Sequence, residues 1–75
     1  MERNIDTEIG RLREKLLMMG GFVEKAIEEA TQALIENQPN RFDRVHEFEE
    51  KINQLHIQVD EDCLNFLAKI GRAHV

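Results

Sequence analysis

Two long stretches of the chain carry apolar residues at steps of three and four, with polar residues between them. The first stretch contains Ile5, Ile9, Leu12, Leu16, Met19, Val23, Ala26, Ala30 and Leu34, and it is widened by Leu17, Phe22 and Ile27. The second contains Phe42, Val45, Phe48, Ile52, Leu55, Val59, Cys63 and Phe66. These steps follow the period of an amphipathic α-helix, and strand-like alternation is absent. The pattern predicts two long helices.

The only segment with helix-breaking residues separates the two stretches. It spans residues 36–40 and holds the only proline of the chain. Pro39 is expected to end the first helix, because the residue before a proline disfavours the helical conformation. Asn40, with Asp43 three residues later, resembles a capping box for the second helix.

We therefore predict helices over about residues 5–37 and 41–69, which makes the fold class all-α, a long antiparallel helical hairpin. Across the hairpin, the first group is expected to face the second: Leu12, Leu16, Met19, Val23, Ala30 and Leu34 against Val45, Phe48, Ile52, Leu55, Val59 and Phe66. Two helices cannot enclose a core, so Leu17, Phe22 and Ile27 would face water unless a third helix or a second chain covers them. The sequence thus predicts a missing neighbour or self-association.

Composition and charge exclude several classes of function. The chain of 75 residues has 10 Lys and Arg against 15 Asp and Glu, which gives a net charge of −5. This balance argues against a nucleic-acid partner, because binding phosphates requires a basic surface. No apolar stretch approaches the length of about 20 residues that spans a bilayer, so no membrane insertion is expected. A single cysteine gives no internal disulfide, and the expected location is cytoplasmic.

Motifs for catalysis or cofactor binding are absent from the chain, so we expect no enzymatic activity, no catalytic residues and no cofactor. Asp43 and His46 are most simply a helix cap followed by a solvated histidine. His56, Asp60 and Cys63 share one helix face, and their side chains could together bind a transition metal. The simpler interpretation is a histidine paired with a carboxylate, beside a cysteine that belongs to the core. We therefore assign no metal ligand.

The order of residues in both stretches resembles PhoU, a family of bacterial phosphate-signalling regulators. In the first stretch the similarity follows Glu8-Ile9-Gly10-Arg11-Leu12-Arg13-Glu14-Lys15-Leu16-Leu17-Met18-Met19-Gly20-Gly21-Phe22-Val23-Glu24. In the second it follows Arg44-Val45, Glu47, Glu49, Ile52-Asn53, Val59-Asp60-Glu61, Cys63 and Leu67-Ala68-Lys69. The resemblance covers about residues 5–69. It implies that residues 1–69 form a partial PhoU-like domain, the first two helices of a PhoU-like three-helix bundle.

The resemblance also implies a regulator that acts without catalysis. PhoU proteins restrain the phosphate-responsive sensor kinase when phosphate is plentiful, and they modulate the phosphate ABC transporter ATPase through protein contacts in the cytoplasm. They commonly form homodimers. The implied role is negative regulation of the phosphate regulon and phosphate homeostasis.

Metal binding in the family is expected from Glu-x-x-x-Asp motifs in a later helix. Glu2 and Asp6 match these letters at the start of the first helix, but in the wrong helix, so no ligand is carried over. His56 stands where relatives more often have an acidic residue. Two alternatives to the PhoU interpretation stay open: a generic helical-hairpin dimerisation module, and a small metal-binding helical protein that uses His56, Asp60 and Cys63.

The last six residues do not continue the apolar pattern. Ile70 to Val75 can be encoded by ATC GGA AGA GCA CAC GTC, which matches a widely used short-read sequencing adapter. In that frame the next adapter codon, TGA, is a stop, and the two preceding letters complete an AAG codon for Lys69. We therefore expect residues 70–75 to be an adapter read-through tail, which belongs outside functional reasoning.

Overall fold

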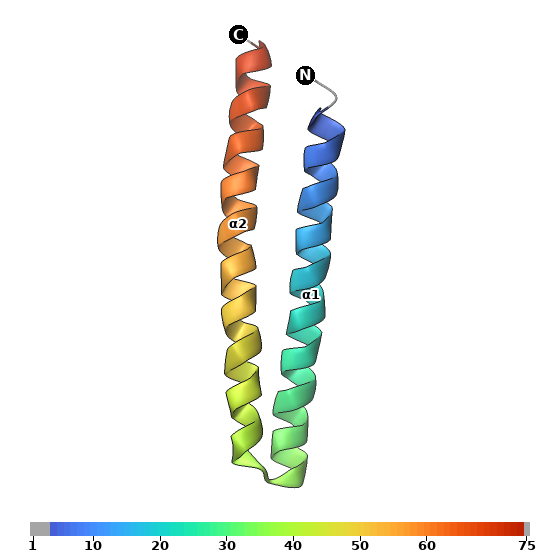
Figure 1. Ribbon diagram of the computed structural model, residues 1–75, viewed down its shortest axis with the longest axis vertical. Helices are drawn as coiled ribbons and strands as arrows, with labels where there is room; N and C mark the ends of the chain where they lie inside the picture. Colours follow the sequence, from blue (N-terminus) through green and yellow to red (C-terminus); the bar gives the residue numbers. More distant parts are fainter. Residues whose placement is uncertain (1–3, 75) are drawn as a thin grey trace.

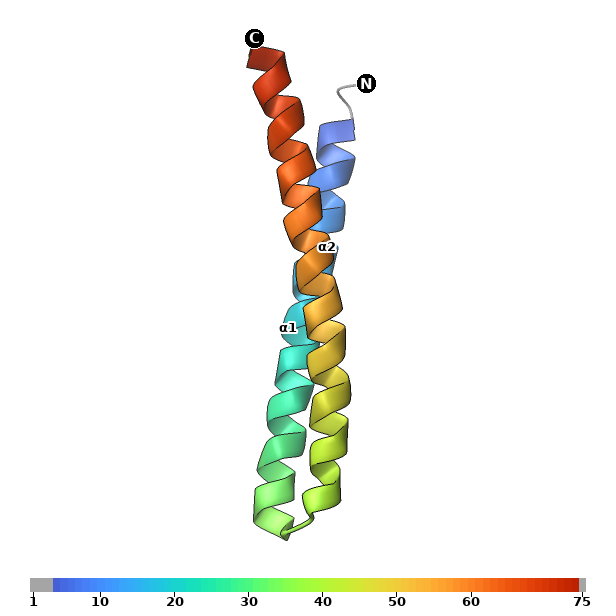
Figure 2. The same cartoon turned by 90° about the vertical axis from the view of Figure 1, so that its left-hand side faces the viewer.

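The computed structural model describes residues 4–74 as two antiparallel helices joined by a tight turn (Figure 1). α1 spans Asn4–Glu36, the short 3-10 helix η1 spans Pro39–Arg41, and α2 spans Phe42–His74. The molecule measures 58 × 16 × 13 Å, and its two helices cross at a shallow angle (Figure 2). The predicted all-α antiparallel hairpin is confirmed.

The turn is formed by the last residues of α1 rather than by the proline alone. Asn37 adopts the left-handed conformation with φ 55°, which asparagine tolerates better than most residues with a side chain. The Gln38 N–H then donates to the Ala33 carbonyl at 3.0 Å, the six-to-one hydrogen bond of a Schellman motif. Pro39 follows as the first residue of η1, so α1 has already ended when the chain reaches it.

Two details at the start and end of α2 differ from the prediction. The capping box is wrong: Asn40 lies inside η1, and its side chain makes no hydrogen bond to the residues the structure describes. α2 also continues through residues 70–74, beyond the predicted end at residue 69. A helical conformation says nothing about the origin of residues 70–75, which stays a prediction, and Val75 lies outside the described residues.

The two helices meet along one line of half-buried residues on each helix, here called the seam. Its members alternate at steps of three and four, the spacing of knobs-into-holes packing. On α1 they are Glu8, Leu12, Lys15, Met19, Phe22, Ala26, Glu29 and Ala33. After the turn they are Arg41 at the end of η1, followed on α2 by Val45, Phe48, Ile52, Leu55, Val59, Asp62 and Phe66. The rings of Phe22 and Phe48 pack with their centroids 6.0 Å apart. Within the described chain, the most buried side chains are Ala33 and Leu55, which are 3% and 9% exposed.

The predicted facing residues are confirmed on α2 and partly wrong on α1. Leu16, Val23 and Leu34 are 54%, 41% and 74% exposed, although they were expected to face α2. Phe22, expected to be uncovered, packs on Phe48 instead. The physical reason is that α1 carries two apolar stripes one position apart, and a single partner helix can cover only one of them.

Candidate functional site: a charged hollow and an apolar strip

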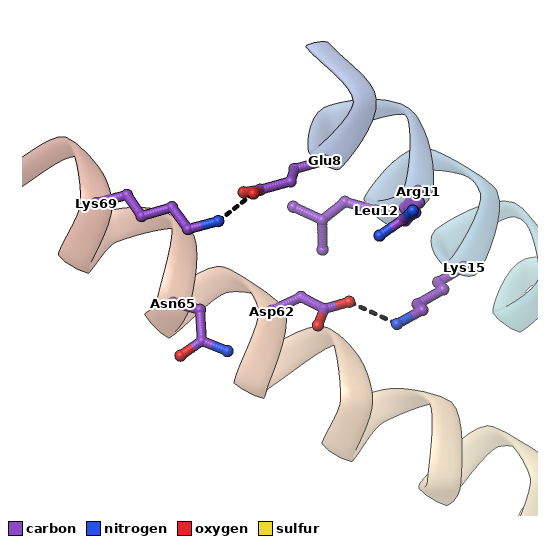
Figure 3. A pocket seen from close by; sticks show the side chains of 7 residues that line it. All are labelled: Glu8, Arg11, Leu12, Lys15, Asp62, Asn65 and Lys69. Carbon is purple, nitrogen blue, oxygen red and sulfur yellow. Dashed lines mark hydrogen bonds and ion pairs between the residues drawn. The ribbon is translucent and has the colours of Figure 1, made fainter. Parts of the chain in front are cut away.

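A shallow hollow lies between the helices at the end of the hairpin opposite the turn (Figure 3). Its volume is about 220 Å³, and it is lined by Glu8, Arg11, Leu12, Lys15, Asp62, Asn65 and Lys69. Lys15 Nζ donates to Asp62 Oδ2 at 2.5 Å, and Lys69 Nζ donates to Glu8 Oε2. Both ion pairs join α1 to α2. Four of the six polar side chains that line the hollow therefore bind each other.

The hollow is better suited to holding the helices together than to binding a ligand. Small-molecule sites usually enclose about 300–1,000 Å³ and are mostly apolar. The sequence reasoning did not identify these charged residues as contacts. The contact between Lys15 and Asp62 could have been predicted, because the two residues occupy seam positions on the two helices and have opposite charges.

A second group of charges joins the helices next to the turn. Glu29 is only 18% exposed, and its carboxylate lies 3.6 Å from the Arg41 guanidinium and 3.3 Å from that of Arg44. Arg41 also lies 3.6 Å from Glu36. Arg44 Nη1 donates a hydrogen bond to Glu29 Oε2. Glu29 Oε1 is buried without a hydrogen-bond partner among the described residues, and the Arg41 guanidinium at 3.6 Å offsets its charge. Ion pairs thus close both ends of an otherwise apolar seam.

The proposed metal-binding face of α2 comes together only in part. His56 Nε2 lies 3.9 Å from Asp60 Oδ2, and both side chains are about two-thirds exposed. Cys63 is a half-buried free thiol. Between residues 4 and 74, no three His, Cys, Asp or Glu side chains form a group that could hold a metal ion. The absence of a metal ligand stays a prediction, and Glu2 of the Glu-x-x-x-Asp match lies outside the described residues.

The other histidine considered from sequence is bound within its own helix. His46 Nδ1 lies 3.2 Å from Glu49 Oε1, and both side chains are exposed. The solvated position expected for His46 is confirmed.

The most extended unpartnered feature is a second stripe of α1, here called the apolar strip. It consists of Ile9, Arg13, Leu16, Gly20, Val23, Ile27, Ala30 and Leu34. Each member follows a seam residue by one position and so points about 100° away from it. Ile27 is 60% exposed and Leu34 74%. The strip runs for most of the length of α1, which makes it a candidate surface for protein contacts.

Residues on α2 extend this surface to one side. In an antiparallel pair, the positions that follow the seam by one lie on the same side of both helices. On α2 these positions include Phe42 and Leu67, which are 37% and 60% exposed. The expectation of an uncovered apolar face is confirmed at Leu17 and Ile27, which are 69% and 60% exposed. Neither helix, over the residues described, has a segment apolar and long enough to cross a bilayer.

Comparison with known proteins gives consistent matches. Residues 16–74 match the profile of a family described as the PhoU domain. The chain is 38% identical over 69 residues to the phosphate-specific transport system accessory protein PhoU homolog of Pseudomonas putida, which covers 92% of this chain and 27% of that protein. For the homolog of Pseudomonas aeruginosa the identity is 35% over 69 residues, covering 92% and 28%.

A more distant relative is the phosphate-specific transport system accessory protein PhoU of Serratia marcescens. It is 31% identical over 64 residues, which cover 85% of this chain and 26% of that protein. No solved structure matches the chain. The chain therefore spans about a quarter of the length of the curated relatives it matches.

Proposed function

Because the chain belongs to the PhoU family, we propose that it takes part in regulating phosphate transport through contacts with other proteins, without catalysing a reaction. The observation that carries this proposal is the family match over residues 16–74. The relatives are named accessory proteins of the phosphate-specific transport system. The apolar strip supports the proposal, because a long uncovered apolar surface is typical of protein contacts.

In this proposal the protein works in the cytoplasm with two partners, the ATPase of the phosphate ABC transporter and the phosphate-responsive sensor kinase. When phosphate is plentiful, contact with the kinase lowers transcription of the phosphate regulon. The acidic net charge of −5 supports protein rather than nucleic-acid partners. Any metal ion would bind through segments of longer relatives, not through residues of this chain.

A transcriptional reporter of the phosphate regulon tests the proposal. The chain is expressed in a bacterium that lacks its own PhoU protein, and reporter output is measured in phosphate-rich medium. We expect the chain to lower the output, and the substitution Ile27→Lys in the apolar strip to abolish that effect. Ile57→Lys is the matched control, because Ile57 lies outside the strip on α2 and is 57% exposed, against 60% for Ile27.

The purified chain supplies the second measurement, direct binding to the transporter ATPase and to the kinase. The proposal fails if the folded chain accumulates in the cell, leaves the reporter unchanged and binds neither protein. Binding that Ile27→Lys and Ile57→Lys weaken equally would place the contact outside the apolar strip.

The second candidate function is that of a helical-hairpin association module. The uncovered strip favours it directly, because two helices leave no other way to bury that surface within residues 4–74. We propose that the chain self-associates, which is compatible with either function. If the chain self-associates but does not change the output of the phosphate reporter, the result favours the association module over the phosphate regulator. The small metal-binding protein has no supporting observation in the described residues.

A further inference from the structure

We infer that the side of the hairpin opposite the apolar strip binds an acidic segment of a partner protein. The inference rests on the protein contacts proposed above and adds a second contact surface with its own chemistry. This surface, here called the basic line, consists of exposed residues that lie one position before the seam and recur at steps of seven. They are Arg11, Met18, Lys25 and Gln32 on α1, and Arg44, Lys51, Gln58 and Asn65 on α2.

The basic line lies outside the area that a third helix on the apolar strip would cover. Positions one before the seam lie on the same side of both helices, and positions one after it lie on the other side. Two contacts show that the halves of the line adjoin: Arg11 and Asn65 line the same hollow (Figure 3), and Lys51 Nζ lies 5.4 Å from the ring centroid of Phe22 on α1. The line is therefore one surface that spans both helices.

The charges of the basic line all have the same sign. Four of its eight members are Arg or Lys and none is Asp or Glu, although the chain has 15 acidic against 10 basic residues. The other members are three amides, which can donate hydrogen bonds, and a methionine, which adapts to irregular surfaces. Positive charges and donors without a negative group suit a ligand that carries carboxylates.

The cations of the line are available to a ligand. Among the described residues, no carboxylate lies within ion-pair distance of Arg11, Lys25 or Lys51. Arg44 donates to Glu29 through Nη1, and a guanidinium has further N–H groups on its other nitrogens. A carboxylate that approaches the line therefore does not have to displace an ion pair within the hairpin.

The spacing of the cations indicates the shape of the segment. In the register that brings Arg11 to Asn65, Lys25 lies level with Lys51, and Arg44 lies level with Gln32. The cations thus occupy three levels, separated along α1 by 14 and 7 residues, or about 21 Å and about 10 Å. A partner helix that lies in the groove between α1 and α2 meets these levels with acidic residues spaced at multiples of seven. At the middle level, a carboxylate between the two lysines offsets their mutual repulsion.

The borders of the line favour a narrow segment over a broad acidic surface. Exposed acidic residues follow members of the line by three positions on both helices: Glu14 and Glu28 on α1, and Glu47 and Glu61 on α2. They repel a wide acidic surface or a nucleic-acid duplex, whereas a single helix in the groove stays beside the cations. Because the net charge is −5 and screening acts over about 8 Å, the attraction is local and selects for position.

Binding of the full chain to the transporter ATPase and to the sensor kinase tests the surface. The double substitution Lys25→Gln with Lys51→Gln should weaken binding to at least one of them by about fivefold. Thr31→Glu with Leu64→Glu is the matched control and should leave binding nearly unchanged. Both double variants make the chain two units more negative and alter one exposed residue on each helix, but Thr31 and Leu64 lie outside the line and the strip.

The outcomes separate this inference from the proposed function. If the chain binds and the two double variants are affected equally, or neither is affected, the basic line is overturned and the proposed function stands. A chain that binds neither protein overturns both. Raising the salt concentration should weaken binding of the unmodified chain more than that of the lysine variant, because screening acts on the charges that the variant lacks.

Carbodiimide cross-linking identifies the chemistry of the partner, because the reagent joins a lysine amine to a carboxylate in direct contact as an amide. In the complex, we expect mass spectrometry to find Lys25 or Lys51 joined to an Asp or Glu of the partner. Cross-links that involve only other lysines of the chain, or only partner lysines joined to acidic residues of the chain, would overturn the inference.

Discussion

Replacing Leu55 with alanine tests whether the seam holds the hairpin together. Leu55 is 9% exposed, which makes it the most buried large side chain among the described residues. The substitution removes three carbons, which corresponds to about 2 kcal/mol of lost burial at 0.8 kcal/mol per carbon. A cavity term raises the range to 2–5 kcal/mol in closed cores. In a two-helix hairpin the neighbours can close over the gap, so about 2–3 kcal/mol is expected.

Chemical denaturation followed by far-UV circular dichroism measures this loss. The matched control is Leu64→Ala in the same helix, where the leucine is 68% exposed. Both substitutions change helix propensity by the same amount, so the difference between them reports burial alone. The control should change the free energy of unfolding by less than about 0.5 kcal/mol. All samples need one protein concentration, because self-association contributes to stability.

Two results would refute the reasoning about Leu55. Equal losses for Leu55→Ala and Leu64→Ala would show that α2 does not pack through its seam face. The second result is a change, in Leu55→Ala alone, in the slope of the unfolding free energy against denaturant concentration. It would show that the substitution altered the compactness of the folded or the unfolded state rather than removing one contact.

Three further predictions follow from other contacts. Asn37→Val should destabilise the hairpin by about 1 kcal/mol, because a β-branched residue resists the left-handed conformation at φ 55°; thermal unfolding should show no such loss for Asn37→Gly. Lys15→Leu and Asp62→Leu should each cost about 1 kcal/mol or more by leaving a half-buried charge unpaired, and the double substitution should recover most of the loss. Simple additivity in that double-mutant cycle would contradict the expectation. Calorimetric titration with zinc should show no micromolar or tighter binding, and tight binding that disappears in His56→Ala would contradict the prediction that α2 holds no metal.

The sequence was sufficient to predict the hairpin, because the helical repeat of apolar residues is interrupted only at residues 36–40, where the helix-breaking residues lie. On α2, six residues of the predicted stripe lie in the seam, namely Val45, Phe48, Ile52, Leu55, Val59 and Phe66, while Phe42 and Cys63 lie beside it. On α1 the same rule was ambiguous. The stripe through Leu16, Val23 and Ile27 is more apolar than the stripe through Lys15 and Glu29, and apolar content alone favours the wrong one.

Complementarity between the two helices decides which stripe of α1 packs against α2. The periodicity of a single helix carries no information about this complementarity. Lys15 and Glu29 find Asp62 and Arg41 at matching levels of α2, so a charged seam position becomes acceptable. The charged hollow could have been anticipated by comparing signs at seam positions of both helices. The end of α1 lies within one residue of the predicted position, but its cause differs, because the helix ends at the left-handed Asn37 before the chain reaches Pro39.

The ion pairs at the open end of the hairpin have a mechanical consequence. Sliding one helix by seven residues would keep the apolar seam in step, and apolar contacts alone would tolerate it. Such a slip brings Glu8 to Asp62 in one direction and Lys15 to Lys69 in the other, so like charges meet either way. The hairpin therefore resists telescoping. When either helix of this 58 Å rod is displaced along its axis, we expect the other to move with it.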